Sequence, residues 1–365
     1  MSVTLPTAII DLDALLWNYR FLEQKATSAE VAPVVKAHAY GLGLIPVTKA
    51  LYENGCRSFF VAYVDEALAL RRLLLDASII VLHGLDESEF AEARANQLIP
   101  VLNHPHALTA WSAYAKQQRQ RLPAYIHLDT GMNRLGFSPA EQVWLTKNTS
   151  LLESLELKGW MSHLACADEF NNPMTTRQRD RLVEALRGLP PAPVSLCNSS
   201  GLFWGTNYLF DQVRPGAALY GINPTPHQAN PMRAVLELQA PLLQVRDVDT
   251  NETVGYGATH RCAHKQRVAT LALGYAGGYH RSLSNCGSVR IGAHLAPLIG
   301  RISMDLITID VTDVPESVAH RGAMATLIGP HRPIDMIASE GGTIGYEILT
   351  SLGSRVSHIY KGGAL

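Results

Sequence analysis

Short apolar runs alternate with helical patterns from the start of the chain to about residue 220. Segments such as LDALLWNYRFLEQKA place apolar residues at three- and four-residue steps, and DEALALRRLLL opens with acids that suit a helix N-terminus. Buried parallel strands appear in sequence as nearly continuous apolar runs. The pattern therefore predicts a parallel sheet with helices on both faces. The apolar runs are residues 32–36, 58–63, 78–84, 98–103, 124–129, 157–164, 193–199 and 210–221.

The number of runs favours one fold over its competitor. Eight parallel strands close a (β/α)8 barrel, and about 220 residues are enough to build one. A doubly wound open sheet is the alternative. No GxGxxG motif follows the first run, which disfavours a dinucleotide-binding sheet.

The sequence pattern changes after residue 232, from alternating strands and helices to successive strands. The segments LELQAPLLQVRDV, RVATLALGYA, SVRIGAHLAPLIGR, LITIDVTDV and MATLIGP follow one another with Gly, Pro, Asp and Asn turns between them. Helical periodicity returns only in SEGGTIGYEILTSL near the end. We therefore expect an α/β protein with two domains, a barrel over residues 1–232 and a β-rich domain over residues 233–365.

Composition excludes several classes of function. Lys plus Arg is 31 and Asp plus Glu is 32, so the chain lacks the excess of positive charge typical of proteins that bind nucleic acid or anionic membranes. The five cysteines are scattered, with no CxxC pair and no metal-ligand spacing, which favours a reducing compartment and no metal. The N-terminal segment MSVTLPTAIIDLDALLWNYR does not resemble a signal peptide, so we expect a cytoplasmic protein.

Polar side chains lie where the predicted barrel strands end, which is where barrel active sites are built. These groups are expected to converge on one mouth of the barrel. They are Lys36 and Tyr40 after the first strand, Arg134 after the fifth, Ser162 and His163 at the sixth, Asn198, Ser199 and Ser200 at the seventh, and Arg214, Gly216 and Ala217 in the eighth.

Two of these groups indicate a cofactor. A partly desolvated lysine such as Lys36 has a lowered pKa and can form a Schiff base. Ser199 and the backbone N–H groups of Gly216 and Ala217 follow strands seven and eight, the usual phosphate position in barrels. A lysine and a phosphate site in one cavity suggest pyridoxal phosphate (PLP).

The ordered motifs resemble those of the alanine racemase family. They are VVKAHAYGLG, HLDTGMNRLGF, MSHLACADE, CNSSG, VRPGAALYG, VGYGATHR, LGYAGGYHR, GRISMDLITID and GTIGYEILTSL, and they cover essentially the whole chain. The resemblance implies a PLP-dependent homodimer that interconverts L- and D-alanine by a two-base mechanism through an external aldimine. It also implies that the D-alanine supplies peptidoglycan synthesis.

The resemblance further implies roles for individual residues. Lys36 would hold PLP and act as one base, and Tyr256 would be the other, supplied with Met304 by the β-rich domain of the partner subunit. A phenol needs nearby cations to act as a base, and Arg134, Arg214 and His163 are the candidates. Arg134 and the backbone of Met304 would bind the substrate carboxylate. The cofactor would be held by Lys36, Tyr40, His163, Asn198, Ser199, Arg214, Gly216, Ala217 and Tyr346. The entry corridor would be formed by Tyr275, Arg281, Arg301, Ile344 and Tyr346, with Asp305 beside them, and Tyr346 and Tyr256 would gate it.

The sequence departs from the family at His127. Many relatives carry a carbamylated lysine there, whose negative charge positions the arginine equivalent to Arg134. Histidine forms no stable carbamate, so we predict none at this position. A bound anion, another carboxylate, or a different way of holding Arg134 would have to replace that charge.

Three alternatives stay open at the level of sequence. The first is a PLP enzyme of the same fold with another reaction or a broader amino-acid range. The second is a non-catalytic PLP-binding protein, although such proteins are usually a barrel alone. The third is a PLP-free Schiff-base aldolase, which would leave the phosphate site and Arg214 without a role.

Overall fold

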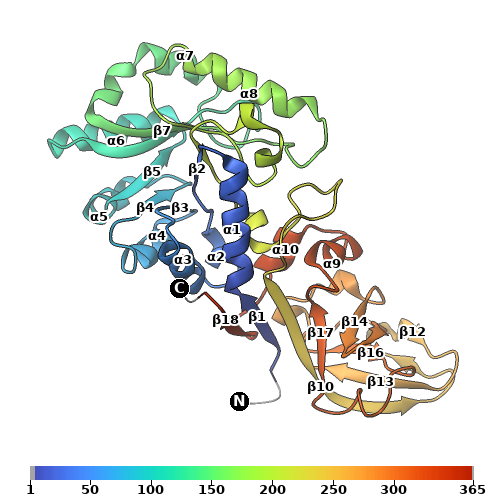
Figure 1. Ribbon diagram of the computed structural model, residues 1–365. Coiled ribbons are helices and arrows are strands. Elements are labelled where there is room, and N and C mark those ends of the chain that lie inside the picture. Colours follow the sequence, from blue (N-terminus) through green and yellow to red (C-terminus); the bar gives the residue numbers. More distant parts are fainter. Residues whose placement is uncertain (1–4, 364–365) are drawn as a thin grey trace.

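The computed structural model describes residues 5–363. The chain folds into a barrel of parallel strands surrounded by helices, with a strand-rich domain beside it (Figure 1). No helix between residues 5 and 363 is both long and apolar enough to cross a membrane. Residues 1–4, part of the segment in which we expect no signal peptide, lie outside the described residues.

The barrel sheet has eight parallel strands in the order β2-β9-β8-β7-β6-β5-β4-β3. The main chain closes the ring between its two end strands, because Val35 N donates to Phe60 O at 2.8 Å and Phe60 N donates to Pro33 O at 2.9 Å. The predicted (β/α)8 barrel is confirmed. Its strands are β2 (Glu30–Val31), β3 (Ser58–Val61), β4 (Ser78–Val81), β5 (Leu98–Leu102), β6 (Leu122–His127), β7 (Leu155–Met161), β8 (Val194–Ser195) and β9 (Gln212–Val213).

The strand lengths follow from what each apolar run packs against. Ile79, Ile80 and Val81 of β4 are fully buried, as expected for a strand covered on both faces. Strands β8 and β9 have two residues each and are much shorter than the runs 193–199 and 210–221. The residues of those two runs that follow the strands form loops and a short helical turn (Ala217–Tyr220) at the barrel mouth.

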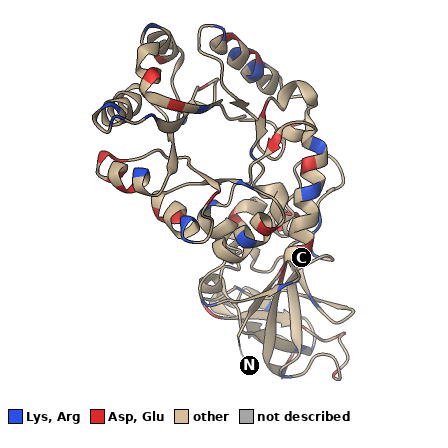
Figure 2. Ribbon diagram, turned by 60° about the vertical axis from the view of Figure 1, so that its left-hand side comes forward, with Lys and Arg blue, Asp and Glu red and all other residues tan. Residues whose placement is uncertain are grey.

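Helices alternate with the barrel strands and form its outer layer, with both signs of charge interspersed along them (Figure 2). Local caps define where they begin. Asp11 accepts a hydrogen bond from Ala14 N at 2.9 Å, and Ser138 and Glu141 form a capping box. The helices are α1 (Leu12–Ala26), α3 (Leu44–Glu53), α4 (Val64–Arg71), α5 (Phe90–Ala95), α6 (Pro105–Gln117), α7 (Pro139–Lys147) and α8 (Pro173–Leu186). The short segment α2 (Lys36–Tyr40) is a left-handed turn at the barrel mouth and not part of this layer.

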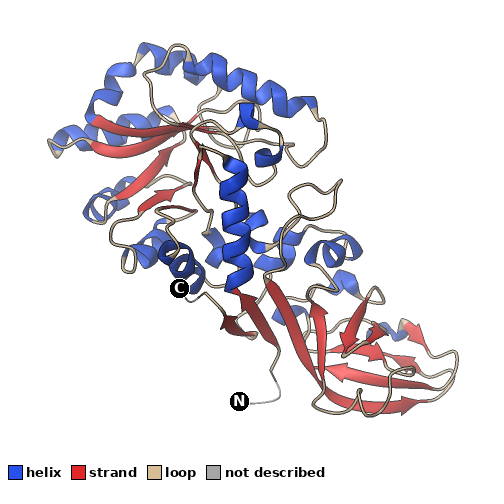
Figure 3. Ribbon diagram, viewed as in Figure 1, coloured by secondary structure: helices blue, strands red, loops and turns tan. Residues whose placement is uncertain are grey.

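The second domain is built mainly from antiparallel strands (Figure 3). The N-terminal strand β1 (Thr7–Asp11) also belongs to its sheet, antiparallel to β10 and parallel to β18, although it lies within the range 1–232. The boundary at residue 232 stays a prediction. The other elements are β10 (Leu236–Val248), β11 (Thr253–Val254), β12 (His260–Arg261), β13 (Gln266–Leu271), β14 (Ser288–Ile291), β15 (His294–Pro297), β16 (Ile307–Asp310), β17 (Met324–Ile328), β18 (Ser357–Lys361), α9 (Ile334–Glu340) and α10 (Gly345–Thr350).

A buried asparagine fastens α1 to the segment that joins the two domains. Asn18 Nδ2 donates to Leu219 O at 3.0 Å and to Arg233 O at 2.9 Å. Its Oδ1 accepts from Arg233 N at 2.8 Å. Since Asn18 is fully buried and one continuous apolar core runs through both domains, this polar contact fixes the register of α1 against the connecting segment.

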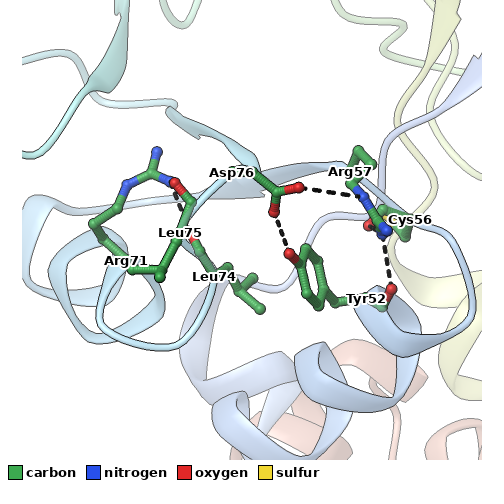
Figure 4. A network of polar contacts seen from close by, with 7 residues as sticks. All are labelled: Tyr52, Cys56, Arg57, Arg71, Leu74, Leu75 and Asp76. Carbon is green, nitrogen blue, oxygen red and sulfur yellow. Dashed lines mark hydrogen bonds and ion pairs between the residues drawn. The ribbon is translucent and has the colours of Figure 1, made fainter.

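A surface network ties α3 to the amino ends of β3 and β4, at the side of the barrel opposite the strand carboxyl ends (Figure 4). The Tyr52 hydroxyl donates to Asp76, and Arg57 donates to the carbonyls of Tyr52 and Cys56 at 2.8 and 2.9 Å. Arg71 donates to Leu74 O at 2.7 Å in the turn before β4. These contacts hold the αβ turns that lead into β3 and β4, on the face that carries no candidate site residue.

We predict that Asn18→Ala destabilises the protein by about 3 kcal/mol, because it removes the partner of one buried carbonyl and of a partly buried carbonyl and N–H. Urea unfolding measures the change. The control is Asn96→Ala, whose side chain makes a surface hydrogen bond to Glu92 O and should change stability by less than about 0.5 kcal/mol. Equal losses in the two variants would contradict the role assigned to Asn18.

Candidate active site

A cavity of about 820 Å³ opens at the carboxyl ends of the barrel strands and is closed on one side by α10 of the second domain. This volume suits a small-molecule cofactor together with its substrate. The predicted site residues that line the cavity are Lys36, Tyr40, Arg134, His163, Asn198, Ser199, Arg214, Gly216, Ala217, Ile344 and Tyr346.

Lys36 directly precedes an unusual backbone turn. Four consecutive residues without glycine, Ala37 to Tyr40, have φ between 53° and 56°, in the left-handed region. The turn places the Lys36 and Tyr40 side chains in the same cavity. The pKa of Lys36 is lowered, first by burial and then by the Arg134 cation, and Glu66 opposes this shift. The lowered pKa expected from the sequence is confirmed.

Ser199 and the turn after β9 form a cradle of backbone N–H groups. The Ser199 hydroxyl oxygen accepts from Gly216 N at 3.0 Å and from Ala218 N at 3.1 Å. A Cβ on Gly216 would overlap the Tyr40 hydroxyl, so glycine allows the Tyr40 ring to close this end of the cavity. The buried Tyr40 ring also packs on Tyr220, with ring centroids 4.7 Å apart.

Arg214 is a cation buried among neutral acceptors. Its terminal nitrogens donate to the Ser195 hydroxyl, to the carbonyls of Ser162 and Leu196, and to His163 Nδ1 at 3.3 Å. Burial lowers the pKa of Arg214 to about 10, which still leaves it charged at neutral pH.

The neighbouring His163 is neutral. Its pKa is held well below the usual 6.5, first by burial and then by the Arg214 and Arg134 cations. Since the guanidinium of Arg214 has no acceptor, His163 Nδ1 accepts their shared hydrogen bond and the ring proton lies on Nε2. Burial and the cations of Arg214 and Arg134 therefore disfavour the expectation that His163 could serve as a cation.

His127 at the end of β6 is neutral as well, and its tautomer follows from Asn103. Asn103 Nδ2 donates to Leu82 O at 3.0 Å and to Val101 O at 3.1 Å, which leaves Oδ1 to accept from His127 Nδ1 at 2.9 Å. Burial, followed by the cations of Arg214 and Arg134, lowers the pKa of His127 to about 4. Its Nε2 is consequently an acceptor without charge. The absence of a carbamate stays a prediction.

Arg134 is exposed at the cavity rim. Among the residues that the structure describes, no carboxylate lies within 4.0 Å of its guanidinium. Asp129, considered as its ion-pair partner, accepts instead from the backbone N–H groups of Gly131, Met132 and Asn133 at 2.9 to 3.2 Å. The loop that carries Arg134 is thus shaped by Asp129 while the guanidinium faces the cavity uncompensated.

Tyr256 and Met304, the two residues predicted to come from the β-rich domain of the partner subunit, do not reach the cavity of their own chain. Tyr256 is 73% exposed, on a loop where Gly255 and Gly257 take φ of 78° and 70°. Met304 is also exposed, and Asp305 pairs with Arg355 at 2.6 Å. The predicted residues that do not line the cavity within one chain are Ser162 and Ser200 of the barrel, and Tyr256, Tyr275, Arg281, Arg301, Met304 and Asp305 of the second domain.

The sequence did not single out three residues of the site. His83 lines the cavity, and Asn103 contacts His127 from behind it. His83 and Asn103 stand at the ends of the third and fourth apolar runs, so the strand-end rule would have found both. Glu347 on α10 is the only carboxylate among the described residues that line the cavity. Its carboxylate accepts from the Thr343 hydroxyl and lies 3.9 Å from His280 Nδ1. Within residues 5–363, no group of three or more His, Cys, Asp or Glu side chains is arranged to hold a metal ion.

We predict that His127 makes stability fall as pH drops through the range from about 6.5 to 4. The folded protein keeps His127 neutral with a pKa of about 4, whereas the unfolded chain binds a proton below its ordinary value of 6.5. Urea unfolding at pH 7 and pH 5 should show a loss of stability that is about 1.5 kcal/mol smaller in His127→Gln than in the unchanged protein. An identical pH dependence in both would contradict a neutral, buried His127.

Comparisons with known proteins agree with this architecture. Residues 10–224 match the family model "Alanine racemase, N-terminal domain", and residues 235–360 match "Alanine racemase, C-terminal domain". The alanine racemase of Acidiphilium cryptum is 47% identical over 356 residues, which cover 98% of this chain and 99% of that one. The alanine racemase of Brucella abortus is 44% identical, covering 96% and 92%.

Solved structures show the same similarity. The alanine racemase of Bartonella henselae, solved with covalently bound pyridoxal phosphate, has a TM-score of 0.95 and 38% identity, covering 98% of this chain and 100% of that chain. The biosynthetic alanine racemase of Pseudomonas aeruginosa has a TM-score of 0.91 and 34% identity, with the same coverage. Since both family models and full-length relatives match, the chain belongs to the alanine racemase family.

Proposed function

We propose that this protein is a PLP-dependent racemase that interconverts L- and D-alanine. The observation that carries the proposal is one cavity at the barrel mouth lined by Lys36, Ser199 and Arg214, in a chain that belongs to the alanine racemase family throughout its length. The cofactor is bound covalently in the similar structure from Bartonella henselae.

The charges and donors of the cavity fit PLP. Lys36, Arg134 and Arg214 supply three cations against the single carboxylate of Glu347, so the cavity suits an anionic ligand. Tyr40, Ser199, Gly216, Ala217 and Tyr346 would hold the phosphate at one end, with Asn198 beside them. The Lys36 amine would hold the aldehyde carbon. When bound, PLP supplies an electron sink that acidifies the α-proton of an amino acid.

Arg214 determines which atoms carry protons near the cofactor ring. A guanidinium keeps its proton and can only donate hydrogen bonds. Arg214 would therefore leave a pyridine nitrogen beside it unprotonated, which would limit how much negative charge the ring withdraws. Neutral His163 receives a hydrogen bond from Arg214 and would lie against the ring. Together the two residues would favour return of the proton to the α-carbon over transamination.

Racemisation needs a proton acceptor on each face of the α-carbon. Lys36, with its lowered pKa, is suited to act on one face. Tyr256 is the proposed base on the other face, and Arg134 with the backbone of Met304 would hold the substrate carboxylate. Because Tyr256 and Met304 lie outside the cavity of their own chain, we propose a homodimer in which each subunit completes the site of the other.

The corridor residues limit the size of the substrate side chain, and the product indicates the biological role. Tyr275, Arg281, Arg301, Ile344 and Tyr346 would form the corridor, with Asp305 beside them, and the gate of Tyr346 and Tyr256 favours a small side chain. We assign the D-alanine product to peptidoglycan synthesis in the cytoplasm, which is consistent with the "biosynthetic" relative from Pseudomonas aeruginosa.

We predict that Lys36→Ala and Tyr256→Phe each lower alanine racemisation by at least about 100-fold, because each removes one proton acceptor. Circular dichroism of alanine solutions measures the rate. Tyr114→Phe, on the outer helix α6, is the control and should keep full activity. Full activity in Tyr256→Phe would contradict the two-base proposal.

The dimer proposal has a separate test, in which the two inactive variants are co-expressed. A mixed dimer contains one site with both Lys36 and Tyr256 and one site with neither. Random pairing should therefore restore roughly a quarter of the unmutated activity. No restoration, in dimers shown to be mixed, would mean that Tyr256 acts within its own chain.

A further inference from the structure

Glu66 bridges two neighbouring strand ends of the barrel. It lies in the first turn of α4, and its Oε2 accepts from Ala62 N at 2.8 Å and from Tyr63 N at 3.4 Å, just after β3. Its Oε1 accepts from Ala37 N at 2.6 Å. One carboxylate thus holds the start of α4 and also the residue that follows Lys36.

The bond to Ala37 falls where the backbone needs support. Each left-handed residue other than glycine costs about 1–2 kcal/mol, and Ala37, His38, Ala39 and Tyr40 form a run of four. Within the turn, Ala39 N donates to Val35 O at 2.9 Å and Gly41 N donates to Ala37 O at 2.8 Å. The N–H of Ala37, the first left-handed residue, donates its hydrogen bond to Glu66 Oε1. The turn is consequently held from another element as well as by its own hydrogen bonds.

The charge of Glu66 acts on Lys36 as well. Glu66 favours the charged form of the Lys36 amine, whereas burial and Arg134 disfavour it. His83 after β4 and His163 after β7 also interact with Lys36, and both have lowered pKa values. The other titratable groups facing the cavity are Tyr40, His127, Arg214, Tyr346 and Glu347. Glu66 is therefore the carboxylate that offsets the cations around the amine.

We propose that Glu66 is a positioning residue for Lys36, which holds the left-handed turn at Ala37 and keeps a negative charge near the amine. Glu66 does not line the cavity, so it acts through Lys36 and not on the substrate. This inference rests on the function proposed for Lys36. It adds a residue from α4 to a site otherwise built from strand ends and α10.

The chain contains a matched control for this role. Glu141 occupies the same position in the first turn of α7, and its Oε2 accepts from Ser138 N and from the Ser138 hydroxyl, both at 2.8 Å. Glu66→Gln and Glu141→Gln therefore remove the same charge from the same helix position. Only Glu66→Gln disturbs a contact beside Lys36.

The first experiment measures how the protonation of the Lys36 amine depends on pH, in the absence of PLP. The full chain is freed of PLP with hydroxylamine, labelled with acetic anhydride across a pH series, and the labelled Lys36 peptide is quantified by mass spectrometry. In Glu66→Gln the labelling curve should shift to lower pH, because loss of a carboxylate disfavours the ammonium form. The Glu141→Gln curve should coincide with that of the unmutated chain. Coincident curves for all three proteins would overturn the proposal.

The second experiment titrates PLP by absorbance. Glu66→Gln should bind PLP about tenfold more weakly, because the turn at Ala37 loses a charged acceptor, whereas Glu141→Gln should bind normally. Glu66→Asp keeps the charge but is one methylene shorter, so it should weaken PLP binding while leaving the labelling curve nearly in place. Equal PLP affinity in all variants would refute the role in holding the turn. If the unmutated chain itself bound no PLP, the proposed function would be wrong. The labelling experiment would still test whether Glu66 acts on Lys36, because it does not use PLP.

Discussion

A buried cation that has no carboxylate partner within residues 5–363 constrains the rest of this site. Arg214 is 3% exposed and donates to a hydroxyl, two carbonyls and a histidine, all of them neutral. A charge in this environment is costly unless its hydrogen bonds are complete and an anion can approach. The strand ends of β7 and β8 supply those acceptors. The cavity is left with an excess of positive charge that an anionic ligand can neutralise.

The same charge explains the state of the neighbouring side chains. Burial, reinforced by the cations, lowers the pKa values of His163 and His127, so each neutral ring can accept a hydrogen bond without adding to the positive charge. The tautomer of His127 is fixed by Asn103, whose amide is oriented by two backbone carbonyls. The barrel therefore presents a rigid arrangement of neutral acceptors and fixed cations, with Lys36 as the group whose protonation can change.

Much of this arrangement could be predicted from the sequence because it follows from local pattern. The periodic segment at residues 12–26 is α1, and the apolar run LELQAPLLQVRDV is β10, each with the bounds that the pattern indicates. The strand-end rule predicts that Lys36, Arg214 and Ser199 share one cavity, and all three line it in the structure. Both signals depend on spacing along the chain, which the fold preserves.

What could not be predicted depends on contacts between distant segments. The pairing of β1 with β10 and β18, and the bonds of Asn18 to Leu219 and Arg233, join residues more than 200 positions apart. The left-handed run that begins at Ala37 contains no glycine, so the sequence gives no sign of it. The contact of Glu66 with Ala37 joins two neighbouring βα units. The neutrality of His163 required the three-dimensional positions of Arg214 and Arg134. The placement of Tyr256 outside its own cavity is likewise a property of the folded chain.

The central claim is that Lys36 holds the cofactor in the cavity beside Arg214. It is tested most directly by reducing the purified protein with borohydride and mapping its peptides by mass spectrometry. The account predicts a yellow protein whose visible absorbance bleaches on reduction, with the pyridoxyl group on the Lys36 peptide and on no other lysine. A colourless protein that takes up no PLP, or a label on a lysine outside the cavity, would contradict it.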